Sequence, residues 1–306
     1  MSQIVLVHGI GQEQEQADPL EQVWLPALAG GVRAAKQPGL ADRLWRDSKP
    51  GDLECRMVFY GDLFLAPGRM GNSQTVDDLT LQQQELATEL AVEWLRQAEQ
   101  RARETEDRDE AYRQRHTIDG QTAGRQGMRA AGRPVLNALA RLRWFAPAGM
   151  TLAERFADRS LAQLTRYLTE EALREEVQRR MAQHVGAETV AIIGHSLGSV
   201  VAFQAAHRLT RELPLLITLG SPLGLRTLVY DRLPEDKEVP AKVRRWVNLA
   251  ARDDLVAAVL DLRELFKDPR GVLESDWTLD TGSEPHQAKF YLTKEQAGAA
   301  VAAAFQ

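Results

Sequence analysis

Several features that mark whole classes of protein are missing from this sequence. It contains one cysteine, Cys55, which excludes an internal disulfide and is typical of a protein from a reducing compartment. No apolar run approaches the roughly 18 residues of a membrane-spanning helix. Acidic side chains outnumber basic ones and give a formal net charge of −5, so the composition provides no overall attraction to nucleic acid. We therefore expect a cytoplasmic protein without a nucleic-acid partner.

Metal-binding patterns are missing as well. The sequence has no His-Glu-x-x-His segment and no paired Cys/His spacing, so we expect neither a metal centre nor a bound cofactor. Cys55 lies in the apolar segment LECRMVFY, which favours a small core residue over a reactive thiol. The first residues, MSQIVLVHGIG, lack a basic start and a small-residue cleavage site. They are typical of a strand rather than of a signal peptide.

The sequence does contain a series of short apolar runs that predict strands. Most show no strict alternation, which is typical of strands covered on both faces. The runs are Ile4–Val7, Arg56–Tyr60, Thr189–Ile193, Leu215–Leu219 and, more weakly, Arg245–Leu249. Helical stretches such as Glu21–Lys36 and Leu197–Arg211 separate them. This order predicts an α/β fold with a doubly wound, mostly parallel sheet.

The segment Pro67–Gly149 interrupts that order. We expect a long polar helix over about Val76–His116, then a Gly-rich basic linker and a short amphipathic helix in VLNALARLRWFAP. Because the segment falls between two core strands, we interpret it as a helical insertion within a single domain of residues 1–306. An amphipathic helix pair over Thr151–Val185 is expected to lead into the next strand.

The most informative segment surrounds Ser196. An apolar strand runs into Gly194-His195-Ser196-Leu197-Gly198 and then into a helix, which is the Gly-x-Ser-x-Gly pattern of a nucleophile elbow. In such an elbow the serine occupies a strained turn, and a side chain at either glycine would collide with neighbouring backbone. The alternative is a glycine-rich turn whose serine caps the helix. We predict that Ser196 is a nucleophile.

The first expected strand ends in VLVHGIGQ. The turn after its His-Gly pair can offer a backbone N–H to a developing oxyanion, and the residue after the nucleophile can offer another. We assign these two donors to Ile10 and Leu197, with Gly11 allowing the sharp turn. His8 is expected to tie the loop by hydrogen bonds. The alternative is an ordinary turn at the end of a strand.

Candidates for an acid and a base lie downstream of the nucleophile. The segment WVNLAARDDLVA places Asp253 and Asp254 at the carboxyl end of an expected strand, where catalytic groups gather in open parallel sheets. We assign the acid to Asp254 and keep Asp253 as the alternative. His286 follows a short expected strand, Trp277–Asp280, and is the predicted general base. His207 lies inside the helix after the elbow and is expected to pack or to face solvent.

These elements together make the chain resemble the α/β-hydrolase superfamily, and most of all its lipase- and esterase-like members with a GHSLG elbow. The resemblance covers Met1–Tyr60 and about Thr189–Gln306. It implies a small sheet of about six strands, because no antiparallel strands precede the strand that ends in His-Gly. The implied catalytic triad and oxyanion hole consist of Ser196, Asp254 and His286 and of Ile10 and Leu197.

The resemblance implies ester hydrolysis through an acyl-enzyme, with a lipid or another small molecule as the ester. Thioesterase, acyltransferase and serine peptidase activities share the acyl-enzyme step and stay open as alternatives. A catalytically silent scaffold that binds a partner is the alternative from another class of function.

The insertion is expected to form a cap or lid over the active site, with a peripheral membrane contact. A basic helix with an apolar side can rest on an anionic lipid surface, and the Gly-rich linker could act as a hinge. The basic and apolar side chains in question are Arg125, Arg129, Arg133, Arg141, Arg143, Leu136, Leu139, Leu142, Trp144 and Phe145. The alternative is a helical hairpin that packs on the core or mediates dimerisation.

Overall fold

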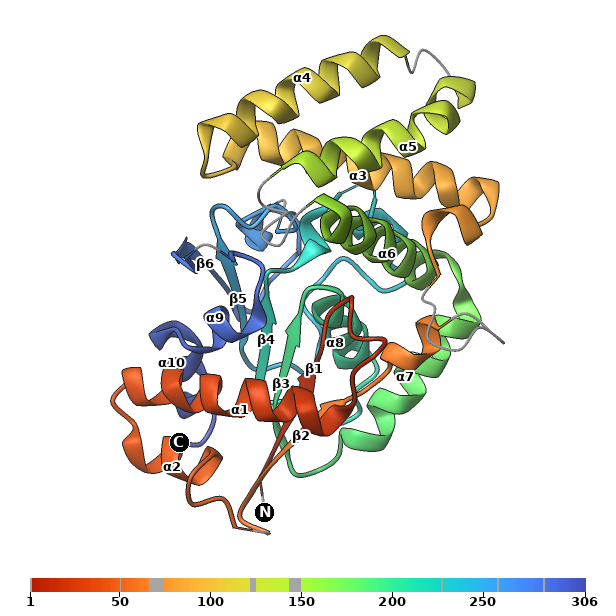
Figure 1. Cartoon of the computed structure of the whole chain (residues 1–306). Coiled ribbons are helices and arrows are strands. Elements are labelled where there is room, and N and C mark those ends of the chain that lie inside the picture. The colour runs from red at the N-terminus through yellow and green to blue at the C-terminus, as the bar shows by residue number, and fades with distance from the viewer. Residues whose placement is uncertain are drawn as a thin grey trace.

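The computed structural model of the chain has one sheet of six parallel strands with helices on both of its faces (Figure 1). It describes residues 2–49, 51–65, 74–121, 125–142, 150–226, 228–257, 259–282 and 284–306. The strands are β1 (Ser2–Val7), β2 (Leu53–Val58), β3 (Thr189–His195), β4 (Leu215–Leu219), β5 (Trp246–Ala251) and β6 (Leu273–Leu279). Their order across the sheet is β2-β1-β3-β4-β5-β6. The predicted doubly wound α/β class is therefore confirmed.

The helices lie in three places: on one face of the sheet, on its other face, and at the carboxyl edge of the strands. They are α1 (Ala17–Ala34), α2 (Pro38–Leu44), α3 (Leu81–Arg101), α4 (Thr105–Gln121), α5 (Arg125–Arg141), α6 (Met150–Thr169), α7 (Glu171–His184), α8 (Leu197–His207), α9 (Ala288–Leu292) and α10 (Glu295–Ala303). One face of the sheet packs against α1, α9 and α10, and the other against α7 and α8. Within the described ranges, no helix combines the length and the apolar character needed to cross a membrane.

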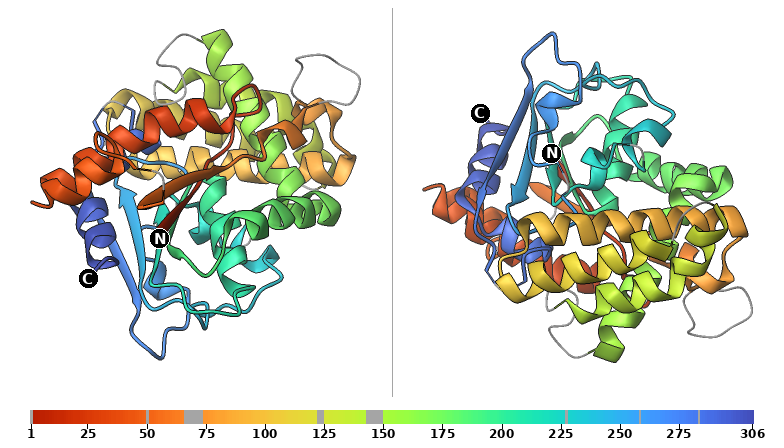
Figure 2. Two further views of the ribbon diagram at one scale, coloured as in Figure 1. Left: turned by 90° about the horizontal axis from the view of Figure 1, so that it is seen from below. Right: turned by 90° about the horizontal axis from the view of Figure 1, so that it is seen from above.

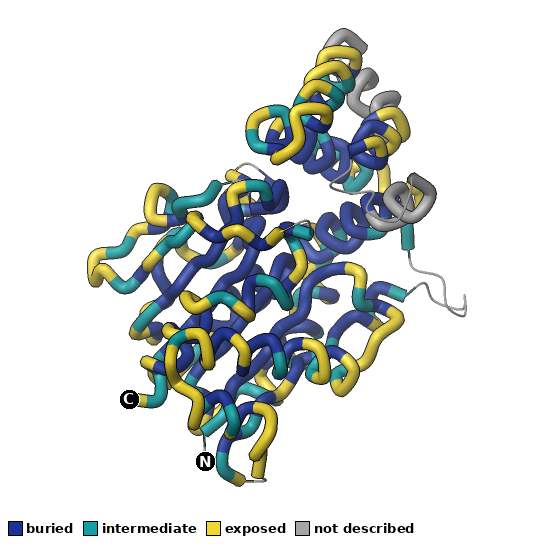
Figure 3. Tube along the Cα trace, turned by 60° about the vertical axis from the view of Figure 1, so that its left-hand side comes forward, coloured by how far each residue is buried: buried dark blue, intermediate teal, exposed yellow. Residues whose placement is uncertain are grey.

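Alternate side chains of the central strands enter two different cores. In β1, Val5 and Val7 join the core that contains α7 and α8, whereas Ile4 and Leu6 join the one that contains α1 and α10. Every residue of β4 and β5 is buried, and Figure 3 shows that buried segments, in dark blue, run through the interior of the molecule. Burial on both faces explains why these runs show no polar alternation in the sequence.

The centre of the sheet is the point where its winding reverses. β1 and β3 are neighbours there, and the chain then adds β2 on one side and β4 on the other. The register places Val7 beside Gly194 and Gly194 beside Thr218, so the loops after these three strands emerge side by side. In open parallel sheets, a reversal of this kind is where ligands bind.

Helices α3, α4, α5 and α6 form a layer at the carboxyl edge of the strands (Figures 1 and 2). We call these four helices the helical layer. A capping box begins α3, in which the Thr80 hydroxyl accepts from the Gln83 N–H and the Gln83 side chain accepts from the Thr80 N–H. The layer packs on itself, because α3 contacts α4, α5 and α6.

The lengths of these helices differ from the prediction. The helix expected over Val76–His116 divides into a 3₁₀ turn at Val76–Asp78, α3 and α4, and Ala102 leaves the helical range with φ −55° and ψ 139°. The two long helices fold back on one another and bury Ala102 and Ala111, which one straight helix could not do. The expected Gly-rich linker is also largely helical, because α5 begins at Arg125 and packs on α3. Packing there outweighs the low helix propensity of glycine.

Other boundaries shift by a few residues. β2 ends before the predicted Arg56–Tyr60 run does, and α8 ends at His207 rather than at Arg211. β6 begins at Leu273 rather than at Trp277, since an edge strand with partly exposed polar side chains has only a weak apolar pattern. The helix pair expected before β3 is present as α6 and α7.

Candidate active site

Ser196 occupies a strained turn between β3 and α8. Its backbone has φ 53° and ψ −128°, a combination that residues other than glycine rarely adopt. A Cβ on Gly194 would lie 2.3 Å from the Gly198 carbonyl oxygen, and a Cβ on Gly198 would lie 2.2 Å from that of Val7. The turn therefore requires both glycines of the Gly-x-Ser-x-Gly pattern, as the sequence predicts.

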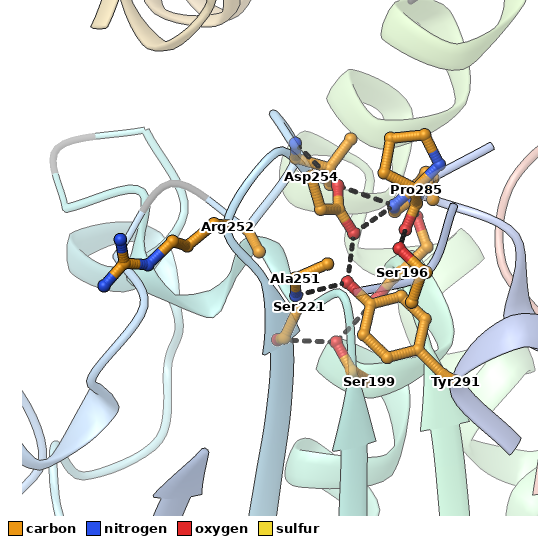
Figure 4. A network of polar contacts seen from close by, with 12 residues as sticks. Ser196, Ser199, Ser221, Ala251, Arg252, Asp254, Pro285 and Tyr291 are labelled. Atoms are coloured by element: carbon orange, nitrogen blue, oxygen red, sulfur yellow. Dashed lines mark hydrogen bonds and ion pairs between the residues drawn. The ribbon is translucent and has the colours of Figure 1, made fainter. Parts of the chain in front are cut away.

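Three side chains that are distant in the sequence meet at this turn, and Figure 4 labels two of them, Ser196 and Asp254. His286 Nε2 lies 2.9 Å from Ser196 Oγ, and His286 Nδ1 lies 3.0 and 2.9 Å from the two carboxylate oxygens of Asp254. Because Nδ1 faces a carboxylate, it carries the proton, and Nε2 can accept the proton of the serine hydroxyl. The structure thus brings together the residues predicted as nucleophile, base and acid.

Asp254 is buried, and hydrogen-bond donors surround its carboxylate. The Tyr291 hydroxyl donates to Oδ2 at 2.7 Å and the Val256 N–H donates to Oδ1 at 3.0 Å. Burial alone would raise the pKa of Asp254, but the charge of His286 and the hydrogen bonds from His286 and Tyr291 hold that pKa below its ordinary value. The Tyr291 hydroxyl in turn accepts from the Ala251 N–H at 2.9 Å. The carboxylate therefore stays ionised and orients the imidazole ring.

The neighbouring carboxylate of Asp253 has different surroundings. It lies 3.9 Å from the guanidinium of Arg103 near the end of α3, and burial raises its pKa above the ordinary value. The carboxylate that contacts His286 is that of Asp254. Of the two aspartates left open by the sequence, Asp254 is thus the one at the base.

The predicted oxyanion donors, Ile10 and Leu197, flank the nucleophile. A Cβ on Gly9 would lie 2.8 Å from Ser196 Cβ, which shows how closely the loop after β1 approaches the serine. Leu197 is the first residue of α8, where backbone N–H groups have no acceptor within the helix. Neither of the two N–H groups bonds to an acceptor in the part of the chain that the structure describes, so both can serve a ligand.

His8 ties this loop in the way the sequence analysis expects. Its Nδ1 donates to the Gly9 carbonyl at 2.8 Å, and its Nε2 accepts from the Tyr60 N–H at 3.1 Å. The Tyr60 hydroxyl donates to the His8 carbonyl, and the two rings stack with their centroids 4.1 Å apart. Burial lowers the pKa of His8 to about 4, so this histidine is neutral at neutral pH and both of its nitrogens are engaged.

Two residues that surround Asp254 and His286 are not among those predicted from the sequence. Gly220, directly after β4, has φ 52°, and a Cβ there would lie 2.5 Å from Asp254 Oδ2 and 3.2 Å from His286 Nδ1. A Gly-Ser pair that follows an apolar run is a turn signal at the carboxyl edge and could have identified this position. Tyr291 carries no such signal, because its contact with Asp254 spans 37 residues.

Two further groups support the turn. The Ser199 hydroxyl lies 2.5 Å from the Ser196 carbonyl and 2.6 Å from the Ser221 hydroxyl, which links the elbow to the loop after β4 (Figure 4). The ring of His195 lies 4.7 Å from that of His286. Burial, and then the charge of His286, lower the pKa of His195 to about 3, so its ring is neutral beside the base.

His207, the other downstream histidine, lies at the end of α8 against Phe203, with ring centroids 4.6 Å apart. Among the residues that the structure describes, no three His, Cys, Asp or Glu side chains group as metal ligands. The arrangement around Ser196 can activate a hydroxyl, return a proton and stabilise a negative oxygen. Comparison with known proteins assigns the chain to no group: no protein family, no curated protein and no solved structure matches it.

Proposed function

We propose that the protein is a serine hydrolase of the α/β-hydrolase type that cleaves carboxylic esters through an acyl-enzyme. The observation that supports this most strongly is the unbroken line of hydrogen bonds from Asp254 through His286 to Ser196. It ends at a strained turn beside the point where the sheet reverses its winding. A helix-capping serine would need neither a buried carboxylate nor a strained backbone.

In the proposed reaction, Ser196 Oγ attacks the ester carbonyl carbon while His286 Nε2 takes the hydroxyl proton. Asp254 stabilises the imidazolium that forms, and the N–H groups of Ile10 and Leu197 donate to the carbonyl oxygen as it becomes negative. The tetrahedral intermediate then expels the alcohol, which receives its proton from His286 Nε2. Water, deprotonated by the same nitrogen, attacks the acyl-enzyme, releases the acid and restores the serine.

The proposed substrates are acyl esters of a lipid or of another small molecule, and the proposed location is the cytoplasm. Leu136 and Leu139 of α5, and Leu142 directly after that helix, do not provide a lipid-facing side, because they are buried within the helical layer. Arg143, Trp144 and Phe145, and the side chains of Arg125 and Arg129, lie outside the described residues. Arg133 pairs with Asp77, and Arg141 lies 3.8 Å from Glu110. A peripheral membrane contact through the insertion is therefore still only a proposal. The three buried leucines do not support it.

The function is tested by labelling with a fluorophosphonate, which reacts with an activated serine. The wild type should be labelled and should hydrolyse members of a panel of acyl esters, whereas Ser196→Ala should do neither. Loss of the nucleophile reduces kcat by about 10⁶ in the best-studied triad. Circular dichroism and thermal unfolding check that the variant is folded. Undiminished labelling of a folded Ser196→Ala variant would contradict the assignment, and an unlabelled, inactive wild type would favour the partner-binding scaffold.

The two neighbouring aspartates provide a matched pair for testing the acid. Asp254→Asn should reduce kcat by about 10⁴, because an asparagine holds the wrong imidazole tautomer. Asp253→Asn, one residue away and in contact with Arg103 rather than with the base, should be much milder. His286→Ala should abolish most turnover. Equal loss of activity in the two aspartate variants would contradict the role assigned to Asp254.

A further inference from the structure

One side chain of the helical layer reaches the loop that carries the oxyanion donor Ile10. We call residues 9–13 the oxyanion loop. Gln163 lies in α6, and its side chain is buried. Its Oε1 accepts from the Gly11 N–H at 2.9 Å, and its Nε2 donates to the Glu13 carboxylate at 2.7 Å. A single amide group therefore fixes two points of the loop.

Glu13 is itself an unusual residue for this position, because it is buried and only 4% of its surface is exposed. Its carboxylate lies 3.6 Å from the Arg159 guanidinium, which is four residues before Gln163 on the same face of α6. A buried carboxylate requires partners of this kind to remain in the folded protein. The loop is therefore bonded to α6 through two buried side chains, Glu13 and Gln163, and through the partly exposed Arg159.

The opposite side of the oxyanion loop contacts the residues that follow β2. A Cβ on Gly61 would lie 2.5 Å from the Gln12 carbonyl oxygen, so the two backbones touch. Gly11 has φ 77°, a conformation that glycine adopts without steric cost. Gln163 accepts a hydrogen bond from the Gly11 N–H, which is the next backbone N–H after that of Ile10. Loss of the hydrogen bond between Gly11 and Gln163 would release the loop from α6 next to the predicted donor, the Ile10 N–H, while its contact with Gly61 would remain.

We propose that Gln163 is a positioning residue for the oxyanion donor at Ile10, and that α6 is a fixed part of the active site rather than a lid that swings open. The inference rests on the proposed function, because it gives the loop a catalytic purpose. An opening motion of α6 would have to break both hydrogen bonds of the Gln163 amide, from the Gly11 N–H and to the Glu13 carboxylate, which is unfavourable for buried groups. Gln163 touches no reacting atom and acts through the loop.

The chain allows an exchange experiment. Gln163→Leu removes both hydrogen bonds, and Gln163→Glu places two carboxylates against one another. In the double variant Glu13→Gln/Gln163→Glu, the carboxylate on α6 can accept from the Gly11 N–H and from the amide at position 13, with the charge of the cluster unchanged. We expect the two single variants to lower kcat on a soluble ester about 10- to 100-fold at a nearly constant KM, less than the loss of a whole oxyanion donor. The double variant should recover most of that loss.

The control is Gln178→Leu in α7. Gln178 is buried and donates to the Val201 carbonyl at 3.1 Å and to the Tyr167 hydroxyl of α6 at 3.2 Å, and neither acceptor belongs to the oxyanion loop. This variant should lose stability like Gln163→Leu but keep the wild-type kcat. Hydrogen exchange of the amides in residues 9–13 gives a readout that needs no activity, and it should accelerate in Gln163→Leu and not in Gln178→Leu.

Faster loop exchange together with a lower kcat, restored in the double variant, supports the proposal. Loop exchange or kcat in Gln163→Leu equal to that of Gln178→Leu overturns it. A wild type that hydrolyses no ester defeats the proposed function and with it the catalytic purpose of the loop, while the exchange data still show whether Gln163 holds residues 9–13.

Discussion

At the scale of single residues, the geometry of the candidate site depends on backbone positions as much as on the side chains proposed to react. A methyl group on Gly220 would lie 2.5 Å from Asp254 Oδ2, whereas one on Gly271, which also has a positive φ of 64°, would meet nothing within 4 Å. Gly220→Ala should therefore displace the acid and lower kcat on the order of 100-fold. Gly271→Ala should carry only the backbone strain of roughly 1 kcal/mol.

The measurement is kcat together with the free energy of unfolding for both glycine variants. If Gly220→Ala and Gly271→Ala lose stability alike and both keep the wild-type kcat, the close approach of Gly220 to the acid has no catalytic weight. If only Gly220→Ala loses kcat, the effect belongs to the displaced carboxylate, because the backbone strain is common to the two variants.

How far single residues could be predicted depends on the range of their contacts. The turn at Ser196 follows from a five-residue pattern, and chain order together with strand ends leads to His286 and to the neighbours Asp253 and Asp254, with Asp254 preferred. The contact between Gly11 and Gln163 spans 152 residues, and no local pattern encodes it. Side chains that support the site from distant elements therefore emerge only once the chain is folded.

At the scale of elements, strands were easier to predict than the helices of the layer. A buried parallel strand is recognisable from its own apolar residues, as in β4. The helical structure breaks between α3 and α4 at Ala102 and Arg103, and neither residue type predicts the end of a helix as a glycine or a proline would. A local contact supports the break instead: the Arg108 guanidinium in the first turn of α4 donates to the carbonyls of both residues, which lie between the two helices.

The end of α3 also holds the loop that carries Asp254, the proposed acid. The Arg101 guanidinium donates to the carbonyls of Asp254 and Ala257, at 3.3 and 2.9 Å, and to that of Arg252 at 3.4 Å. An ammonium group cannot reproduce this planar set of donors. We therefore expect Arg101→Lys to lower kcat about tenfold at a nearly constant KM, and Arg101→Ala to lower it further.

The control on the same helix is Arg96→Ala. Arg96 pairs with Glu93 one turn away, and its side chain is 51% exposed, so its removal should change neither kcat nor stability by much. Steady-state kinetics and thermal unfolding of all three variants provide the comparison. A kcat in Arg101→Ala equal to that in Arg96→Ala would show that α3 does not position the acid.

At the scale of the whole molecule, the helical layer is attached to the site at both of its ends. Arg101 of α3 bonds the loop that carries Asp254, and Gln163 of α6 bonds the oxyanion loop. The fold class follows from the order of strands and helices in the sequence. The attachment of α3 and α6 to the site does not, because it depends on how these two helices cross the edge of the sheet. The helical layer therefore lies across the site and is fixed to it at two points, Arg101 in α3 and Gln163 in α6.

Two buried histidines beside the site should make the stability of the whole molecule depend on pH. Burial lowers the pKa of His8 from its ordinary 6.5 to about 4, and burial with the charge of His286 lowers that of His195 to about 3. Below pH 6.5 the unfolded chain binds a proton at each histidine, while the folded protein binds none until the pH reaches the lowered values. Stability is therefore fully present above pH 6.5 and is lost as the pH falls toward 4.

The size of this loss can be measured one histidine at a time. Between pH 7.5 and pH 5, each histidine should remove about 2 kcal/mol from the free energy of unfolding. Urea unfolding at the two pH values gives this difference for the wild type, for His8→Gln and for His195→Gln. Each variant is less stable at both pH values, but its difference between them should be smaller than that of the wild type by about 2 kcal/mol. A variant whose difference equals that of the wild type would show that its histidine takes up a proton in the folded protein, and the neutral ring inferred at that position would then be wrong.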